Sequence, residues 1–87
     1  MCTYIIGKTA VSGSAKGTRG WISIDTAHVY YDHPYHSTFD HSLNIDFVNE
    51  ANGGRERVAL ELSAESAREL IRKIEAALAA GEAAHGA

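Results

Sequence analysis

Alternating apolar and polar positions predict four β-strands in residues 2–62. Residues 2–11 are rich in β-branched and aromatic side chains, and residues 21–31 resume that pattern. The two later strands, 42–47 and 57–62, alternate strictly. In each strand the larger apolar residues share one face: Leu43, Ile45 and Phe47 in the first, and Val58, Leu60 and Leu62 in the second.

The segments between these strands have the composition of turns and loops. Residues 12–20 are rich in glycine and serine, which predicts a turn or flexible loop. Residues 32–40 contain the only proline, Pro34, and we interpret them as an ordered loop. Residues 49–54 contain an Asn-Gly pair, which is typical of a hairpin turn.

A single helix is predicted after the fourth strand. Ser63 suits the N-cap position, and an apolar stripe follows at helical spacing. Gly81 is a typical residue just beyond a helix end, so we expect one compact domain over residues 1–81 and a frayed tail over 82–87. The stripe consists of Leu70, Ile71, Ile74, Ala77 and Leu78.

The order of elements predicts an α+β fold, a four-stranded antiparallel sheet with one C-terminal covering helix (β-β-β-β-α). One helix cannot cover both faces of such a sheet. We therefore expect the uncovered face, including Trp21 and Val29, to meet a second subunit in a homodimer.

Length, cysteine count and charge narrow the class of protein. The chain has 87 residues and one cysteine, Cys2, so no disulfide forms within it. A lone cysteine and no recognisable signal peptide predict a cytoplasmic protein, and no apolar run suits a membrane span. The net charge of −3 and the scattered basic residues argue against nucleic acid as a partner.

The strongest chemical signal is a cluster of histidine and aspartate in the middle of the chain. Four of the five histidines and all four aspartates lie between Asp25 and Asp46, and no Lys or Arg lies between Gly20 and Gly54. Imidazole and carboxylate groups without competing cations are what a divalent-metal site or an acid–base site requires.

For a metal site, the ligands that we predict are His33, His36 and His41, with His28 or Asp40 completing the set. Zinc suits these ligands best, and Fe, Cu, Ni or Mn are further candidates. The spacing matches no zinc-finger or HExxH pattern. Three histidines with one aspartate resemble a catalytic metal site that keeps a position open for water or substrate.

Two other interpretations of these residues stay open. A metal-free isomerase or cyclase would use one His or Asp to move a proton while Tyr30, Tyr35 and Asn44 contact a small organic substrate. Alternatively, the chain is a non-enzymatic dimeric binding module. In that case Asp32 caps a turn, His41 is a hydrogen-bonded core residue and the tyrosines straddle core and solvent.

Three stretches resemble a family of short bacterial proteins classed as a domain of unknown function. They are MCTYIIGK at residues 1–8, DHPYH at residues 32–36, and DHSLNIDF at residues 40–47 with the helix start LSAESA at residues 62–67. The resemblance covers nearly the whole chain. It implies a bacterial, cytoplasmic protein and no particular activity.

Overall fold

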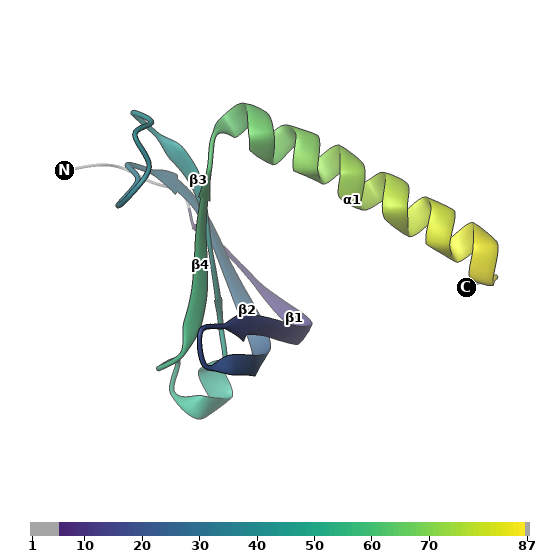
Figure 1. Ribbon diagram of the computed structural model, residues 1–87, viewed down its shortest axis with the longest axis horizontal. Coiled ribbons are helices and arrows are strands. Elements are labelled where there is room, and N and C mark those ends of the chain that lie inside the picture. Colours follow the sequence, from purple (N-terminus) through teal and green to yellow (C-terminus); the bar gives the residue numbers. More distant parts are fainter. Residues whose placement is uncertain (1–5, 87) are drawn as a thin grey trace.

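A computed structural model of the chain describes residues 6–86 as one antiparallel sheet followed by one helix (Figure 1). The strands pair in the order β1-β2-β3-β4, and each neighbouring pair is antiparallel. This confirms the predicted α+β fold. The elements are β1 (Ile6–Gly17), β2 (Gly20–Asp32), β3 (Ser42–Val48), the short 3-10 helix η1 (Glu50–Asn52), β4 (Arg57–Leu62) and α1 (Ala64–His85).

The β1–β2 hairpin is longer than the sequence predicts. The composition of residues 12–20 predicts a turn or loop, but residues 12–17 belong to β1 and Gly20 to β2, so the turn is confined to Thr18 and Arg19. Glycine and serine weaken a strand without preventing its ladder, and the β2 partner supplies the hydrogen bonds. The pairing shifts between Ala10 and Gly13, as in a β-bulge, which bends a hairpin. Residues 2–5 of the predicted strand, Cys2 included, lie outside the described residues.

Both later connections occur where the sequence predicts them. Residues 33–41 form the loop that contains Pro34, and residues 49–56 join β3 to β4. In the second connection, the Asn49 side chain accepts a hydrogen bond from Asn52 N at 3.1 Å, and Gly53 and Gly54 adopt positive φ angles of 79° and 66°. Glycine takes this left-handed conformation without steric cost, which explains the Asn-Gly pair here.

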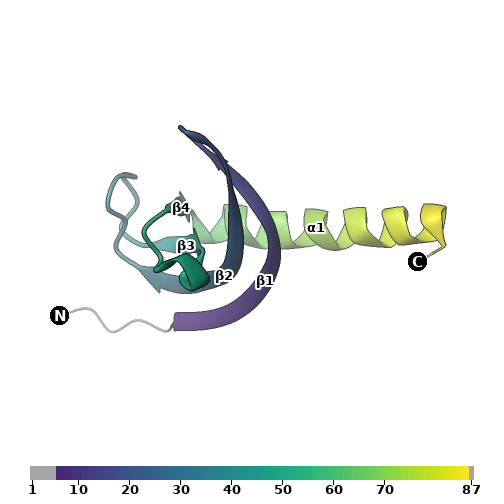
Figure 2. The ribbon, with the colours of Figure 1, turned by 90° about the horizontal axis from the view of Figure 1, so that it is seen from below.

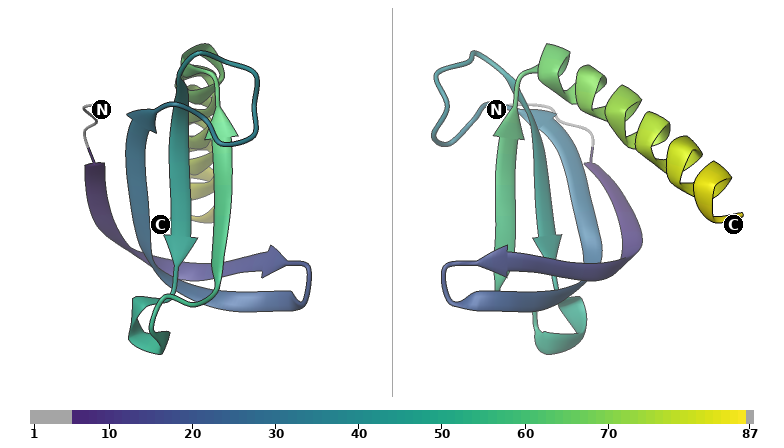
Figure 3. Two further views of the ribbon diagram at one scale, coloured as in Figure 1. Left: turned by 90° about the vertical axis from the view of Figure 1, so that its left-hand side faces the viewer. Right: turned by 45° about the vertical axis from the view of Figure 1, so that its right-hand side comes forward.

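The strand register gives the sheet one polar face and one apolar face. On the polar face His28 lies opposite Asp46, and Tyr30 lies opposite Asn44. The residues between them, such as Val29 opposite Ile45, point to the apolar face. The loop 33–41 lies on the side of the polar face, while the hairpin bends to the opposite side, where the helix projects (Figures 1 and 3).

Helix α1 begins where predicted and ends later. The Ser63 hydroxyl accepts a hydrogen bond from Ser66 N at 3.1 Å, so Ser63 is the N-cap. The helix continues through Gly81 to His85, so residues 82–85 are helical and not frayed. A glycine costs a helix interior only about 1 kcal/mol, and the alanines around it favour helix. Gly86, at a φ of 70°, ends the helix instead.

The helix does not cover the sheet. No residue of α1 from Ala64 to His85 is buried, and the helix axis leads away from the strands (Figures 1 and 2). Its first turns alone border the apolar face, where they form a groove with Tyr31 and Leu43. The single connecting residue, Ser63, has an extended backbone, and this sets the direction in which the helix leaves β4.

Candidate functional site

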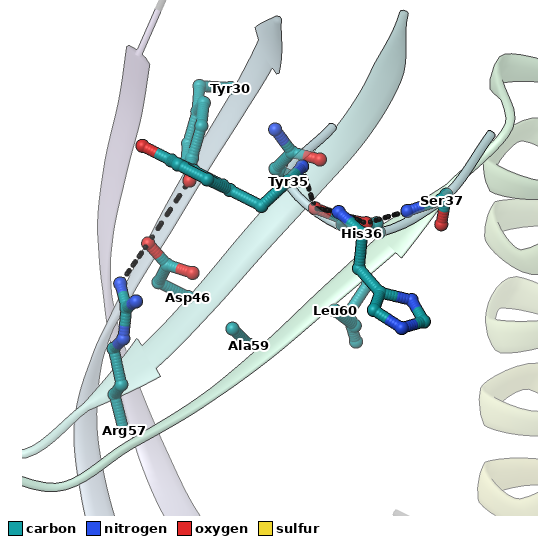
Figure 4. A pocket seen from close by; sticks show the side chains of 10 residues that line it. Tyr30, Tyr35, His36, Ser37, Asp46, Arg57, Ala59 and Leu60 are labelled. Carbon is teal, nitrogen blue, oxygen red and sulfur yellow. Dashed lines mark hydrogen bonds and ion pairs between the residues drawn. The ribbon is translucent and has the colours of Figure 1, made fainter. Parts of the chain in front are cut away.

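The polar face of the sheet is hollowed beneath the loop 33–41. Two adjoining hollows of about 410 and 470 Å³ share four lining residues and form one groove, which we call the polar groove. Figure 4 shows the residues that line the first of these hollows. Volumes of this size are typical of sites for small molecules. The four shared residues are Tyr30, Tyr35, Asp46 and Arg57.

Asp46 is the acceptor at the centre of the polar groove. Its Oδ2 accepts a hydrogen bond from the Tyr30 hydroxyl at 3.3 Å and from Arg57 Nη1 at 3.4 Å (Figure 4). Burial, followed by the nearby Asp46 carboxylate, raises the pKa of Tyr30 above its ordinary value of 10.0. Tyr30 therefore stays protonated at neutral pH, and its hydroxyl remains a hydrogen-bond donor.

Asn44, on β3, lines the groove and is nearly inaccessible, with 2% of its surface exposed. Its Oδ1 accepts a hydrogen bond from the buried Ser42 hydroxyl at 2.6 Å. Its Nδ2 has no hydrogen-bond partner among the described residues. A buried amide donor without a partner costs about 1–3 kcal/mol, so this one requires an explanation.

Glu61, on β4, holds the loop above the groove. Its carboxylate accepts hydrogen bonds from the backbone N–H groups of Tyr35, His36 and Ser37. The bonds from Ser37 and Tyr35 lower the pKa of Glu61 below its ordinary value of 4.5. The sequence pattern does not reveal the role of Glu61, since an outward-facing acid in a strand resembles a solubilising residue. The loop residues that Glu61 binds also lie 24 to 26 positions away.

His28 belongs to a charged group at the lower end of the polar groove. Its Nε2 lies 3.4 Å from Glu50 Oε2, and Lys8 Nζ lies 3.2 Å from Glu50 Oε1. Lys8, more than His28, lowers the pKa of Glu50. His28 therefore has a carboxylate partner in η1.

His33 and His41 lie together at the two ends of the loop 33–41. Their rings stack with centroids 4.6 Å apart, and His41 also stacks on Tyr31 at 5.7 Å. The Nδ1–H of His33 donates to the Asp40 carbonyl at 2.9 Å. His41 is exposed, so the alternative of a buried core histidine is wrong; it lies just before β3 begins, where no layer covers it.

The structure brings the predicted metal ligands together only in part. His33 pairs with His41 and also lines one hollow with His28, whereas the His36 side chain points away from Asp46 (Figure 4). The Asp40 carbonyl, not its carboxylate, contacts His33. Within residues 6–86, no three His, Cys, Asp or Glu side chains lie close enough together to hold one metal ion.

The predicted substrate contacts come together more fully. Tyr30, Tyr35 and Asn44 all line the same hollow, although they come from β2, the loop and β3. Arg57 was not identified from the sequence. It occupies a polar position at the start of β4, and only the pairing of β4 with β3 brings it to Asp46.

These features define the class of protein as a small α+β domain, in which a curved antiparallel sheet carries a polar groove on one face. The chain belongs to the family of unknown function DUF6295, whose model matches residues 1–87. This confirms the predicted membership of a family of unknown function, and the bacterial origin stays a prediction. No curated protein and no solved structure matches the chain. In the described part of the chain, no helix is both long and apolar enough to cross a membrane.

Proposed function

We propose that the polar groove binds a small, flat organic molecule that offers a hydrogen-bond acceptor to Asn44 and a donor to Asp46. The observation that carries this proposal is the buried Nδ2 of Asn44, which has no partner among the described residues. Buried polar groups without partners are rare in folded proteins, and ligand sites are among the places that retain them. A bound acceptor would satisfy this donor.

The other side chains of the groove favour the same kind of ligand. Tyr30 and Tyr35 supply aromatic surface, and Figure 4 shows the Tyr35 side chain extending toward Tyr30. Aromatic side chains favour flat ligands through stacking. Asp46 already accepts from Tyr30 and Arg57 at 3.3 and 3.4 Å, lengths that leave room for a shorter bond from a ligand. Cyclic amides combine the required acceptor and donor in one flat ring.

Tyr35 would act as a movable ring at the rim of this site. Its side chain is 92% exposed, whereas its backbone N–H is bound to Glu61. A fixed backbone with an exposed side chain lets the ring turn without moving the loop. The ring would then fold over a ligand bound in the groove.

The test is an NMR titration of the ¹⁵N-labelled chain with a panel of cyclic amides, such as 2-pyridone, and cyclic hydrocarbons of matched size. We expect an amide to shift the Asn44 side-chain resonances and the hydrocarbons to leave them unchanged. Asn44→Leu should weaken binding roughly tenfold, the usual effect of losing about 1.4 kcal/mol. Asn52→Leu, in the exposed turn η1, is the matched control. No shift at Asn44, or equal binding by Asn44→Leu, would rule out the proposal.

A divalent metal ion, zinc first, is our second candidate, supported by the neighbouring rings of His33 and His41. Their stacked rings would have to turn so that two nitrogens converge, with Asp32 or Asp40 adding an oxygen ligand. Elemental analysis of protein purified without an affinity tag tests this. Near one metal ion per chain, lost in His33→Ala and kept in His85→Ala, would support it. Protein that stays metal-free after incubation with zinc would exclude it.

We also propose a location in the cytoplasm, which rests on the single cysteine of the chain, Cys2. The groove proposal does not depend on this location. Either a metal-free acid–base enzyme or a binding module could use the same pocket, and turnover of a bound cyclic amide would distinguish them.

A further inference from the structure

The apolar side chains of the described residues are poorly covered in the single chain. Only Ala27 and Val48 are buried hydrophobic residues there. The apolar face of the sheet is only half-buried, although the strand pattern is that of a core face. We call this surface the apolar sheet face, formed by Val29, Ile45, Phe47, Val58 and Leu60.

A second apolar surface runs along the helix. Ile71, Ile74 and Leu78 have 56%, 51% and 57% of their surface exposed, and Leu70 has 42%. These four residues, the helix stripe, share one side of α1 because they follow helical spacing. A soluble helix normally turns such a stripe toward a core. Here Ile71 borders the groove with Tyr31 and Leu43. The helix axis then leads away from the sheet (Figure 2), so no residue of the stripe is buried.

The exposed surface exceeds that of a compact monomer by the size of an interface. A folded monomer of 9.4 kDa exposes about 5,000 Å², whereas this chain exposes 6720 Å². The excess of roughly 1,700 Å² per chain amounts to about 3,400 Å² for two chains, within the roughly 2,000–5,000 Å² of total surface that obligate homodimers bury. The radius of gyration, 14.7 Å, also exceeds the roughly 12 Å expected for a compact chain of this length.

We propose that two copies of this chain form a two-fold symmetric dimer, in which the helix stripe of each chain packs on the apolar sheet face of the other. Both apolar surfaces lie on the same chain. A two-fold axis therefore creates two equivalent contacts, in each of which the helix stripe of one chain covers the apolar sheet face of the other. A single connecting residue, Ser63, directs the helix away from its own sheet. The stripe therefore lacks cover within its own chain and is free for a partner.

The dimensions of the two surfaces agree. Leu70 to Leu78 span about 12 Å along a helix at 1.5 Å per residue. Three neighbouring strands span about 10 Å at the usual 4.8 Å spacing, so the stripe crosses β2, β3 and β4. This contact leaves Asn44, Asp46 and Arg57 of the polar groove outside the interface, because the strand register places them on the other face of the sheet. Leu60 borders both the groove and the apolar sheet face. The dimer and the polar contacts of the proposed ligand site nevertheless use different residues.

The first test is the mass in solution, measured by light scattering or sedimentation at tens of micromolar. We expect twice the chain mass of 9.4 kDa. Ile74→Glu places a charge in each of two symmetric contacts and should weaken association by roughly a hundredfold. The matched control is Ala76→Glu, since Ala76 lies on the opposite side of the helix and is also exposed. A monomeric parent chain, or an Ile74→Glu variant as dimeric as Ala76→Glu, would overturn the proposal.

A second test keeps the arrangement falsifiable if Ile74→Glu fails to fold. A dimer assembled from isotope-labelled and unlabelled parent chains should give intermolecular nuclear Overhauser effects between Ile74 methyls and the methyls of Ile45 or Leu60. Its unfolding temperature should also rise with protein concentration, because folding and association are then linked. Intermolecular effects confined to helix–helix pairs, or a concentration-independent unfolding temperature, would overturn the proposed packing.

Discussion

At the scale of single residues, Glu61 shows how one charge organises the groove. Its carboxylate accepts hydrogen bonds from three successive backbone N–H groups of the loop. These bonds hold in place a loop whose exposed side chains provide little packing. Hydrogen bonds to a charged acceptor are stronger than neutral ones. Glu61 thereby fixes the backbone of Tyr35 at the rim of the groove while the Tyr35 ring remains exposed.

We predict that Glu61→Gln loosens the loop without unfolding the sheet. A neutral amide oxygen is a weaker acceptor, so the N–H groups of Tyr35 and Ser37 should exchange with solvent several-fold faster. Hydrogen exchange followed by NMR measures this. Glu75→Gln, on the exposed helix, is the control and should leave the loop unchanged. Unaltered exchange in Glu61→Gln would mean that other contacts hold the loop.

At the scale of elements, local signals predicted what local forces determine. The strict alternation of β3 and β4, the turn glycines and the Ser63 cap each act within a few residues, and all were recovered. The length of the β1–β2 hairpin is not predictable in this way. Glycine and serine have no preference for strands, and residues 13–17 of β1 form a strand because they pair with β2. The helix orientation depends on the dihedral angles of Ser63, which composition does not encode.

Part of the candidate site is likewise predictable from the sequence. The sequence predicts Tyr30, Tyr35 and Asn44 as substrate contacts, and the structure places all three around one hollow, while their role stays a prediction. Glu61 and Arg57 were missed because their roles arise from strand pairing and from a loop distant in sequence. Clustering of histidines along the chain does not imply that they all converge in space. His28 lies on β2, and within the loop 33–41 the rings of His33 and His41 stack while the His36 side chain points away from Asp46.

The start of the helix is the element whose stability is most directly testable. Ser63→Ala removes the side-chain acceptor for Ser66 N, and loss of an N-cap costs about 1 kcal/mol. For a domain of this size that loss should lower the unfolding temperature by roughly 4–8 °C. Thermal unfolding by circular dichroism measures it. Ser63→Asp should retain the cap, and Ser12→Ala, in the exposed hairpin, is the neutral control. Equal stability of Ser63→Ala and the parent chain would show that the cap is unimportant.

At the scale of the whole molecule, three carboxylates join segments that lie far apart in sequence. Asp25 accepts the N–H groups of Glu50 and Ala51 at 2.8 and 3.1 Å, Glu50 pairs with Lys8, and Glu61 binds the loop. Backbone hydrogen bonds lower the pKa of Asp25, chiefly the bond from Glu50. With few buried apolar residues in the described chain, these charged links contribute to holding the sheet, the turn and the loop together.

The pH dependence of stability follows from these three groups. Each has a folded-state pKa below its ordinary value, 3.8 for Asp25 and 4.5 for Glu50 and Glu61, so its contribution is present above that value. The contribution is lost as the pH falls through the lowered pKa. We therefore expect the unfolding temperature to stay level from pH 7 to 5 and to fall below about pH 4.5.

A metal bound by histidines would give a different curve, with stability lost as the pH falls through roughly 6. Thermal unfolding of the parent chain and of His33→Ala across this range separates the two. A decline near pH 6 that His33→Ala abolishes would favour the metal, whereas identical curves that decline only below pH 4.5 would assign the acid response to the carboxylates.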